Sequence, residues 1–249
     1  MEPDDATDDL PPKRAWVTTL RRMHWIDALG IGLFLVLIGL TLYSGELDHA
    51  IMSMLFFGGA VMIHRRITPP DGPVDLEGRL VGFGILLNVI VLCVMYEPTT
   101  AGSQGLESGA NPWLRFYPVT SAASWVLVAY GFRGLKRYWQ MPFLFLFLGL
   151  PWLVLHKFFD MALITSMTVS MVLGLIGFES YLEQPLFVGI GTSRVSVNIG
   201  CSGMEAMTYL LGLAVLALLA FRPPSWLWYV LVPPVAVMTA FTINVIRVT

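Results

Sequence analysis

The sequence predicts an all-α polytopic membrane protein, with about seven to eight helices in a bundle and a short β-hairpin before one of the late helices. Hydrophobic residues make up 56% of the 249 and charged residues only 13%, whereas soluble domains carry about a quarter charged residues. The mean hydropathy is +0.70, and several apolar runs approach or exceed the ~18–20 residues that cross a bilayer. A net charge of −2 provides no basic surface for nucleic acid, so we expect membrane lipids, and no nucleic acid, among the partners.

The chain divides into three parts. Residues 1–25 form a polar tail, acidic first and then basic, and we expect its basic part in the cytoplasm. Residues 26–138 hold the N-terminal transmembrane helices, and residues 139–249 form a second, less regular part. The first apolar run is too long, and starts too late, for a cleaved signal peptide. We therefore expect a multi-pass protein of the plasma membrane.

The N-terminal helices are connected by segments that alternate in charge. The connections at 64–79 and 133–139 are basic, whereas the loop at 97–116 holds two Glu and a single Arg, Arg115. Because Lys and Arg favour cytoplasmic loops, we place both basic connections inside the cell and the 97–116 loop outside. The helices themselves are predicted at 26–44, 47–63, 78–96 and 117–133.

Residues 139–178 are harder to assign. Two prolines and a glycine interrupt the apolar run that opens this stretch, and residues 158–178 contain enough Asp, Ser and Thr for an interfacial or partly buried helix. A later turn at Arg222 is basic and rich in proline, which indicates the cytoplasm and puts the start of the preceding helix outside. We therefore count seven full crossings plus one irregular helix. The alternative is eight crossings with one violation of the charge rule.

A short β element is expected before the next helix. Residues 186–197 contain two β-favouring runs separated by Gly189-Ile190-Gly191, which predicts a hairpin. Such a hairpin must lie at the interface or be covered by protein, because open sheet edges do not face lipid. The helix that follows is predicted at 201–221, so the hairpin would deliver Cys201 to the extracytoplasmic membrane surface.

Cys201 is expected at the start of this helix, where unpaired N–H groups and the helix dipole favour a negative charge. Such a position lowers the pKa of a thiol and makes a thiolate nucleophile more available. Ser202 and Glu205 have the spacing of a capping box, which supports a helix beginning here. Glu205 would also oppose thiolate formation unless it is turned away. The competing interpretation of Cys201 is a small apolar residue at a helix end.

The last helix is predicted at 225–249, with Asn244 and Arg247 on one face. An Arg near the end of a membrane helix is commonly a snorkelling anchor. Beside a thiol it also suits acyl transfer, in which the thiolate attacks a carbonyl and the guanidinium stabilises the oxyanion. Asn244 would orient Arg247 or add a donor. Weaker candidates are His156, for acid–base chemistry, and Arg194, for a substrate carboxylate or a lipid phosphate.

The pattern V-x-V-x-x-x-C-S-G at 195–203, joined to N-x-x-R at 244–247, resembles the exosortase/archaeosortase family. The segment LGLIGFESYLEQPLFVGIGTSRVSV before the cysteine adds to the likeness, which covers residues 140–249. The resemblance implies a membrane-embedded cysteine protease and transpeptidase, a functional analogue of sortase. Its partners would be exported proteins with a C-terminal sorting tail, which it cleaves, and a lipid or other acceptor that anchors the product at the cell surface.

By this resemblance Cys201 is the nucleophile and Arg247 a second catalytic residue, with Asn244, Ser202 and Gly203 in supporting positions. The active site would face the extracytoplasmic side. The family's third residue, a His or a second Arg on a later helix, has no counterpart in the sequence. We therefore expect residues 139–249 to be a catalytic core that lacks its C-terminal end.

The alternative is a polytopic transporter or lipid-binding protein with an anion site at Arg247. Broken helices and an intramembrane Arg suit that function, but no inverted repeat is visible in the sequence. Replacing Cys201 by Ser discriminates between the two, because a transporter should tolerate the change. The two cysteines, Cys93 and Cys201, form no metal-binding pattern, and we expect no cofactor and no metal in either case.

Overall fold

The chain forms eight helices and one three-stranded sheet within the part that the structure describes. Five of these helices are long and apolar enough to cross a membrane, judged by length and composition. The predicted class, a helical membrane protein with a small β element before the cysteine-bearing helix, is confirmed. The computed structural model describes residues 13–70, 72–95, 112–149, 154–155, 158–183, 187–191, 193–197 and 201–249.

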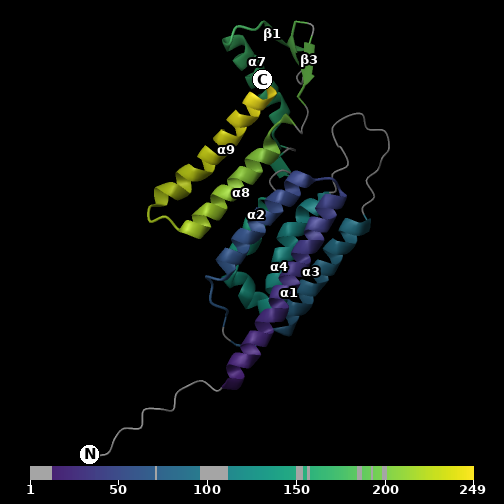
Figure 1. Ribbon diagram of the computed structural model, residues 1–249, viewed down its shortest axis with the longest axis vertical. Coiled ribbons are helices and arrows are strands. Elements are labelled where there is room, and N and C mark those ends of the chain that lie inside the picture. The colour runs from purple at the N-terminus through teal and green to yellow at the C-terminus, as the bar shows by residue number, and fades with distance from the viewer. Residues whose placement is uncertain are drawn as a thin grey trace, which may run out of the picture.

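Four helices make up the N-terminal bundle, and they lie side by side in Figure 1. Phe56, Val126 and Leu144 are completely buried in its apolar core, which extends to Tyr209 of a later helix. Part of α8, in the second half of the chain, thus packs against the apolar core of the bundle. Its helices are α1 (Lys13–Tyr43), α2 (Leu47–His64), α3 (Leu76–Met95) and α4 (Pro112–Arg137).

Helix α4 begins earlier than the sequence predicts, at Pro112 instead of residue 117. Proline suits the first position of a helix, because its missing N–H has no intrahelical partner there. Leu114 and Tyr117 are 2% and 0% exposed, so the first turns of α4 pack into the bundle. Arg115, which the charge pattern assigns to the outer loop, therefore lies in the first turn of α4 and is itself buried.

The stretch between α4 and the sheet is irregular, as predicted. Helix α5 (Gln140–Leu146) is short and packs on α4. Helix α7 (Met161–Leu175) has 15 residues, fewer than the ~20 that cross a bilayer. The Asp160 side chain caps α7 by accepting a hydrogen bond from the Leu163 N–H at 3.0 Å. Because α7 also contacts the sheet and a later helix, it is a partly buried helix that lies against the rest of the protein.

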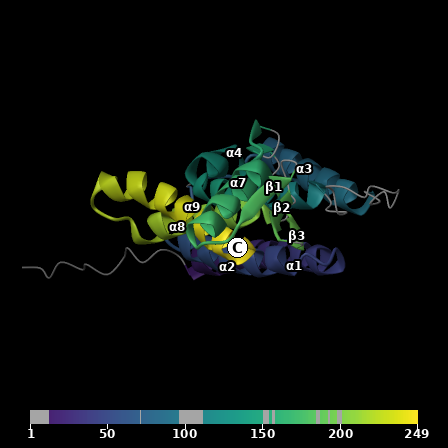
Figure 2. The same ribbon diagram turned by 90° about the horizontal axis from the view of Figure 1, so that it is seen from above.

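The predicted hairpin is present, and the structure adds a third strand to it. Strands β1 (Ser180–Glu183), β2 (Phe187–Ile190) and β3 (Ser193–Ser196) form an antiparallel sheet in that order. Val188 of β2 is 3% exposed and packs with side chains of α7 and of the last helix in one buried cluster. Seen from above, the sheet lies beside α7 and the C-terminal end of the chain (Figure 2).

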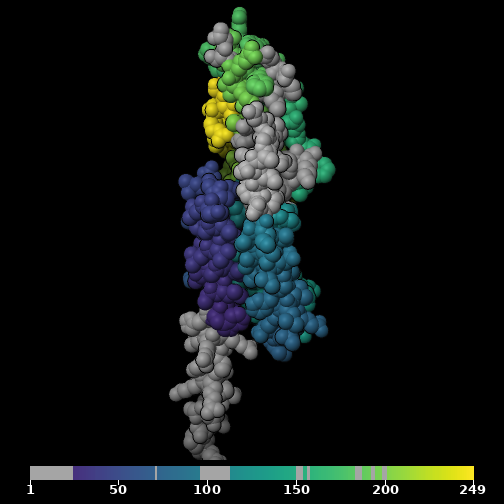
Figure 3. Space-filling model, turned by 90° about the vertical axis from the view of Figure 1, so that its right-hand side faces the viewer, coloured from purple at the N-terminus to yellow at the C-terminus, as the bar shows by residue number. Residues whose placement is uncertain are grey.

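Two antiparallel helices, α8 (Met204–Phe221) and α9 (Trp226–Val248), close the fold. Arg222 ends α8 in a left-handed conformation with φ +46°. Ser225 starts α9 by accepting a hydrogen bond from the Leu227 N–H at 3.3 Å. The end of α9 thereby returns to the start of α8 and to the sheet, and these segments gather at one end of the molecule (Figures 1 and 3).

Candidate active site

The cysteine loop, residues 201–203, is a short turn directly before α8. Gly203 is the N-cap residue of the helix, with φ +73°, a left-handed conformation that favours glycine. The predicted capping box is therefore wrong, because Gly203 and not Ser202 occupies the cap position. The Ser202 hydroxyl accepts the Met204 N–H at 3.4 Å, and Glu205 bonds elsewhere. Cys201 lies just before the helix start and not in its first turn.

Asn244 connects the cysteine loop to Arg247. Its amide nitrogen donates to the Cys201 carbonyl at 2.9 Å, and its amide oxygen accepts from Nη2 of Arg247 at 2.8 Å. Asn244 is 4% exposed, so both bonds form in a setting where an unpaired amide would be costly. The structure thus brings Cys201, Asn244 and Arg247 together across α8 and α9, and it orients the guanidinium through Asn244 as the sequence suggested.

Two further contacts fix the cysteine loop. The Thr165 hydroxyl of α7 donates to the Ser202 carbonyl at 3.1 Å, so a third helix holds the loop. A Cβ at Gly203 would lie 2.5 Å from Cγ of Asn244, closer than real Cβ contacts. Gly203 is needed for its backbone conformation and also for the close approach of α9. Ser202 and Gly203 are therefore supporting residues in a structural sense.

The side chain of Cys201 lies in apolar surroundings and is half-buried. An environment with few polar groups and little water strengthens the electrostatic interactions of any charge that forms there. Arg247 is exposed next to this apolar cluster. Cys201 packs against a cluster whose buried members come mainly from α7, β2 and α9 and include Val169, Leu173, Val188 and Val245.

No hydrogen bond or ion pair described above involves Arg194 or His156, the two weaker candidates. Arg194 is exposed on β3 and is paired in register with Gly189 of β2. His156 falls outside the described residues. No group of three or more His, Cys, Asp or Glu side chains suited to a metal ion occurs in the described part of the chain.

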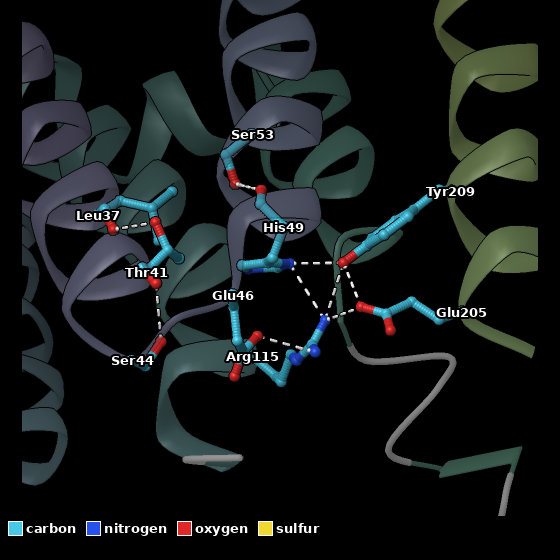
Figure 4. Close-up of polar contacts among 9 residues, drawn as sticks. All are labelled: Leu37, Thr41, Ser44, Glu46, His49, Ser53, Arg115, Glu205 and Tyr209. Atoms are coloured by element: carbon cyan, nitrogen blue, oxygen red, sulfur yellow. Dashed lines mark hydrogen bonds and ion pairs between the residues drawn. The ribbon is translucent and has the colours of Figure 1, made fainter. Parts of the chain in front are cut away.

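A second polar cluster, which the sequence analysis missed, lies beside the start of α8 (Figure 4). We call it the Arg115 cluster, and it contains Glu46, His49, Arg115, Glu205 and Tyr209. Arg115 contacts Glu46 through Nη2 at 2.8 Å and Glu205 through Nη1 at 2.6 Å. The same Nη1 lies 2.9 Å from the Tyr209 hydroxyl and 3.2 Å from Nδ1 of His49.

The Arg115 cluster is itself closed by hydrogen bonds between its other members. The Tyr209 hydroxyl donates to Oε1 of Glu205 at 2.6 Å and lies 2.8 Å from Nδ1 of His49. Arg115, His49 and Tyr209 are 5%, 1% and 7% exposed. Glu46 is the residue directly before α2. Burial raises the pKa of its carboxyl; the Arg115 charge opposes this increase, and the Glu205 charge adds to it.

Only part of the Arg115 cluster can be recognised from the sequence. Glu205 and Tyr209 have i, i+4 spacing and share one face of α8, but nothing links that face to residues some ninety or more positions earlier. Charge counting assigned Arg115 to a solvated loop. A buried Arg needs acidic partners, and this requirement could have been recognised only if α4 had been predicted to start at Pro112.

Comparison with known proteins decides the family. The profile of the transmembrane exosortase family (Exosortase_EpsH) matches residues 42–249. The chain belongs to that family. The match extends well beyond the likeness visible at 140–249 and includes α2, α3 and α4, so Arg115 and three of the four bundle helices lie within the matched region. Searches of curated proteins and of solved structures find no significant match.

Membership of the exosortase family supports a membrane transpeptidase kind of function, and the five apolar helices agree with a multi-pass membrane protein. The elements that hold the cysteine loop also lie in the part of the chain that matches the exosortase family. This loop is held by α7, α8 and α9 together, and all three lie within the matched region.

We expect Gly203→Ala to disrupt the cysteine loop. A non-glycine residue in the left-handed region costs about 1–2 kcal/mol, and the added Cβ would push Asn244 away from the Cys201 carbonyl. The variant should melt at a lower temperature than the parent in detergent. Gly84→Ala in α3, where the added Cβ meets nothing within 4 Å, is the matched control and should melt like the parent. An unchanged melting temperature for Gly203→Ala would contradict the cap geometry.

Proposed function

We propose that this exosortase is a cysteine protease and transpeptidase, which cleaves the C-terminal sorting tail of exported proteins and transfers them to a surface anchor. Cys201 is the nucleophile in this proposal, and Arg247 stabilises the charge that develops on the substrate. The observation that carries it is the hydrogen-bonded connection from Cys201 through Asn244 to Arg247, in a chain that belongs to the exosortase family.

In the first step the Cys201 thiolate attacks the carbonyl carbon of the scissile peptide bond. The carbonyl oxygen becomes an oxyanion, and the Arg247 guanidinium is a donor suited to it, since its planar fork matches such an oxygen and it stays charged. Collapse of the intermediate breaks the carbon–nitrogen bond, and the released amine takes up a proton. The substrate then remains attached to Cys201 as a thioester.

In the second step an acceptor replaces the thiolate. A nucleophilic group on a lipid or another anchoring molecule attacks the thioester carbon, the carbon–sulfur bond breaks, and Cys201 returns to its starting state. The same oxyanion stabilisation serves both steps, because each passes through a tetrahedral intermediate at the same carbon. Half-burial of Cys201 among apolar side chains would limit access of water to this thioester.

The extracytoplasmic location of the site is part of the proposal. Arg66, in the basic connection after α2, donates a hydrogen bond to the Ala220 carbonyl near the end of α8. At the other end of these two helices, Glu46 and Glu205 share Arg115. Since basic connections favour the cytoplasm, the opposite end, with the cysteine loop, is assigned to the outside.

Replacing Cys201 tests the nucleophile. In a host that lacks an exosortase of its own and carries a tail-bearing substrate, Cys201→Ala and Cys201→Ser should both leave the tail uncleaved, since a hydroxyl is a poor nucleophile unless an adjacent base activates it. The measurement is the mobility shift of the co-expressed substrate. Cys93→Ala is the matched control and should process the tail normally, because Cys93 is buried in the N-terminal bundle. Processing by Cys201→Ala would end the proposal, and processing by Cys201→Ser at the parent rate would show that a thiolate is not required.

Replacing Arg247 tests the oxyanion donor. Arg247→Ala should slow processing by about 10²–10³, the loss typical of one oxyanion donor. Arg247→Lys should also be impaired, because an ammonium does not reproduce the planar fork. Arg65→Ala, which removes an exposed Arg at the other end of α2, should process normally. A normal rate for Arg247→Ala would reduce Arg247 to a snorkelling anchor.

Labelling tests the membrane side. With Cys93 replaced by Ala, a membrane-impermeant thiol reagent should label Cys201 in intact cells, because the thiol is half-buried and not enclosed. Pro224→Cys, in an otherwise cysteine-free chain, probes the exposed turn between α8 and α9 and should be labelled only after the cells are opened. The reverse pattern would show that the site faces the cytoplasm.

A further inference from the structure

Glu205 is the acidic side chain next to the cysteine loop, at the second position of α8. A carboxylate beside a thiol disfavours the thiolate, because the two negative charges repel. The Glu205 side chain is 40% exposed, so burial does not confine it. Two hydrogen bonds of 2.6 Å do so instead, one from Nη1 of Arg115 and one from the Tyr209 hydroxyl.

Cys201 and Glu205 have different neighbours. Cys201 packs against an apolar cluster that α7, β2 and α9 build together, whereas the Glu205 carboxylate turns toward α4 and the next turn of its own helix (Figure 4). The start of α8 therefore separates a cysteine side from a carboxylate side. What holds the carboxylate on its side is a residue of the N-terminal bundle, and not a residue of the cysteine loop.

Arg115 is well fixed for this task. Its side chain is 6% exposed, and its second Nη is bound to Glu46 of α2 at 2.8 Å. The two ends of one guanidinium thus contact two carboxylates from different helices, a geometry that the ammonium of a Lys does not reproduce. Burying such a group costs desolvation energy, and a buried ion pair adds little net stability compared with apolar packing. Its placement beside the cysteine loop therefore calls for a role besides stability.

We propose that Arg115 is a positioning residue for Cys201, which neutralises Glu205 and holds its carboxylate away from the thiol. The inference rests on the proposed role of Cys201 as the nucleophile. Arg115 never touches the substrate in this scheme. It acts through Glu205, and it makes the reactivity of a thiol in the second half of the chain depend on a residue of the N-terminal bundle.

Other charged groups around the cysteine loop remain the same in the test. Cys201 packs against a cluster built from α7, β2 and α9, and the charged residues of α7, the sheet and α9 are the same in every variant below. They are Asp160 at the start of α7, Glu179 before β1, Glu183 at the end of β1, Arg194 on β3 and Arg247 on α9.

The experiment measures how fast a small neutral reagent, iodoacetamide, alkylates Cys201 over a range of pH. The full chain is used in detergent, with Cys93→Ala so that Cys201 is the sole thiol. Arg115→Gln should slow alkylation about tenfold at neutral pH and move the pH profile up by about one unit, the usual size of a nearby like-charge effect. Glu205→Gln should react at least as fast as the parent.

The double variant Arg115→Gln/Glu205→Gln decides between positioning and simple stability. If Arg115 acts through the Glu205 charge, removing that charge restores the parent rate and pH profile. If Arg115 only stabilises the fold, the double variant stays at least as slow as Arg115→Gln, and the proposal is overturned. An Arg115→Gln variant with the parent rate and profile would overturn it as well.

Removal of Arg115 leaves the largely buried Glu46 carboxylate, whose side chain is 15% exposed, without its cation and can prevent folding. In that case Arg115→Lys, with and without Glu205→Gln, provides the same comparison with a charge retained in the cluster. A slower rate that Glu205→Gln restores supports the proposal, and equal rates refute it. Alkylation requires no sorting tail, so this result is separable from the proposed function. Tail processing by Cys201→Ala would remove the transpeptidase, whereas a failed rescue by Glu205→Gln removes only the role of Arg115.

Discussion

The buried guanidinium of Arg115 is the interaction on which the arrangement of the two halves depends. The N-terminal bundle and the cysteine-bearing half meet mainly along α2 and α8, and most of that contact is apolar. At the end next to the cysteine loop the contact becomes polar, and there Arg115 links α2, α4 and α8 through Glu46 and Glu205. Apolar packing tolerates small displacements between helices. A charged group bound at both ends does not, because each displacement leaves a buried charge unpaired.

The cysteine loop is thus fixed from two sides by different means. On the α9 side, the Asn244 amide donates to the Cys201 carbonyl and accepts from Arg247. These two bonds hold the cysteine loop and the guanidinium in position relative to each other. On the α4 side, Arg115 controls the charge that lies nearest along α8. Gly203 stands between the two, in a backbone conformation that allows the close approach of Asn244. A small change in the position of Asn244 or of Arg115 would therefore affect the surroundings of the Cys201 thiol.

Much of this protein was predictable from local signals. Apolar length gave five helices that are long and apolar enough to cross a membrane, but it also predicted a span at 117–133, where α4 is not one of the five. The β-favouring residues around Gly189 and Gly191 gave β2 and β3. The spacing of Asn244 and Arg247 gave their shared face, which depends only on helix geometry. The capping box failed because Ser202 and Glu205 fit a local pattern, while the tertiary structure offered Glu205 the stronger partner in Arg115. The third strand β1 and the Arg115 cluster depend on contacts between distant segments, which one sequence does not reveal.

The tight turn between α8 and α9 also sets the rotational phase of the last helix. Asn244 reaches the Cys201 carbonyl only because a fixed number of residues separates it from Ser225, where α9 begins. One residue inserted on that path would turn the amide by about 100° around the helix axis, since an α-helix has 3.6 residues per turn. An insertion or deletion between residues 204 and 244 would therefore disrupt the contact with the Cys201 carbonyl as much as replacement of Asn244 itself. Variation in length is better accommodated in connections outside this pair of helices.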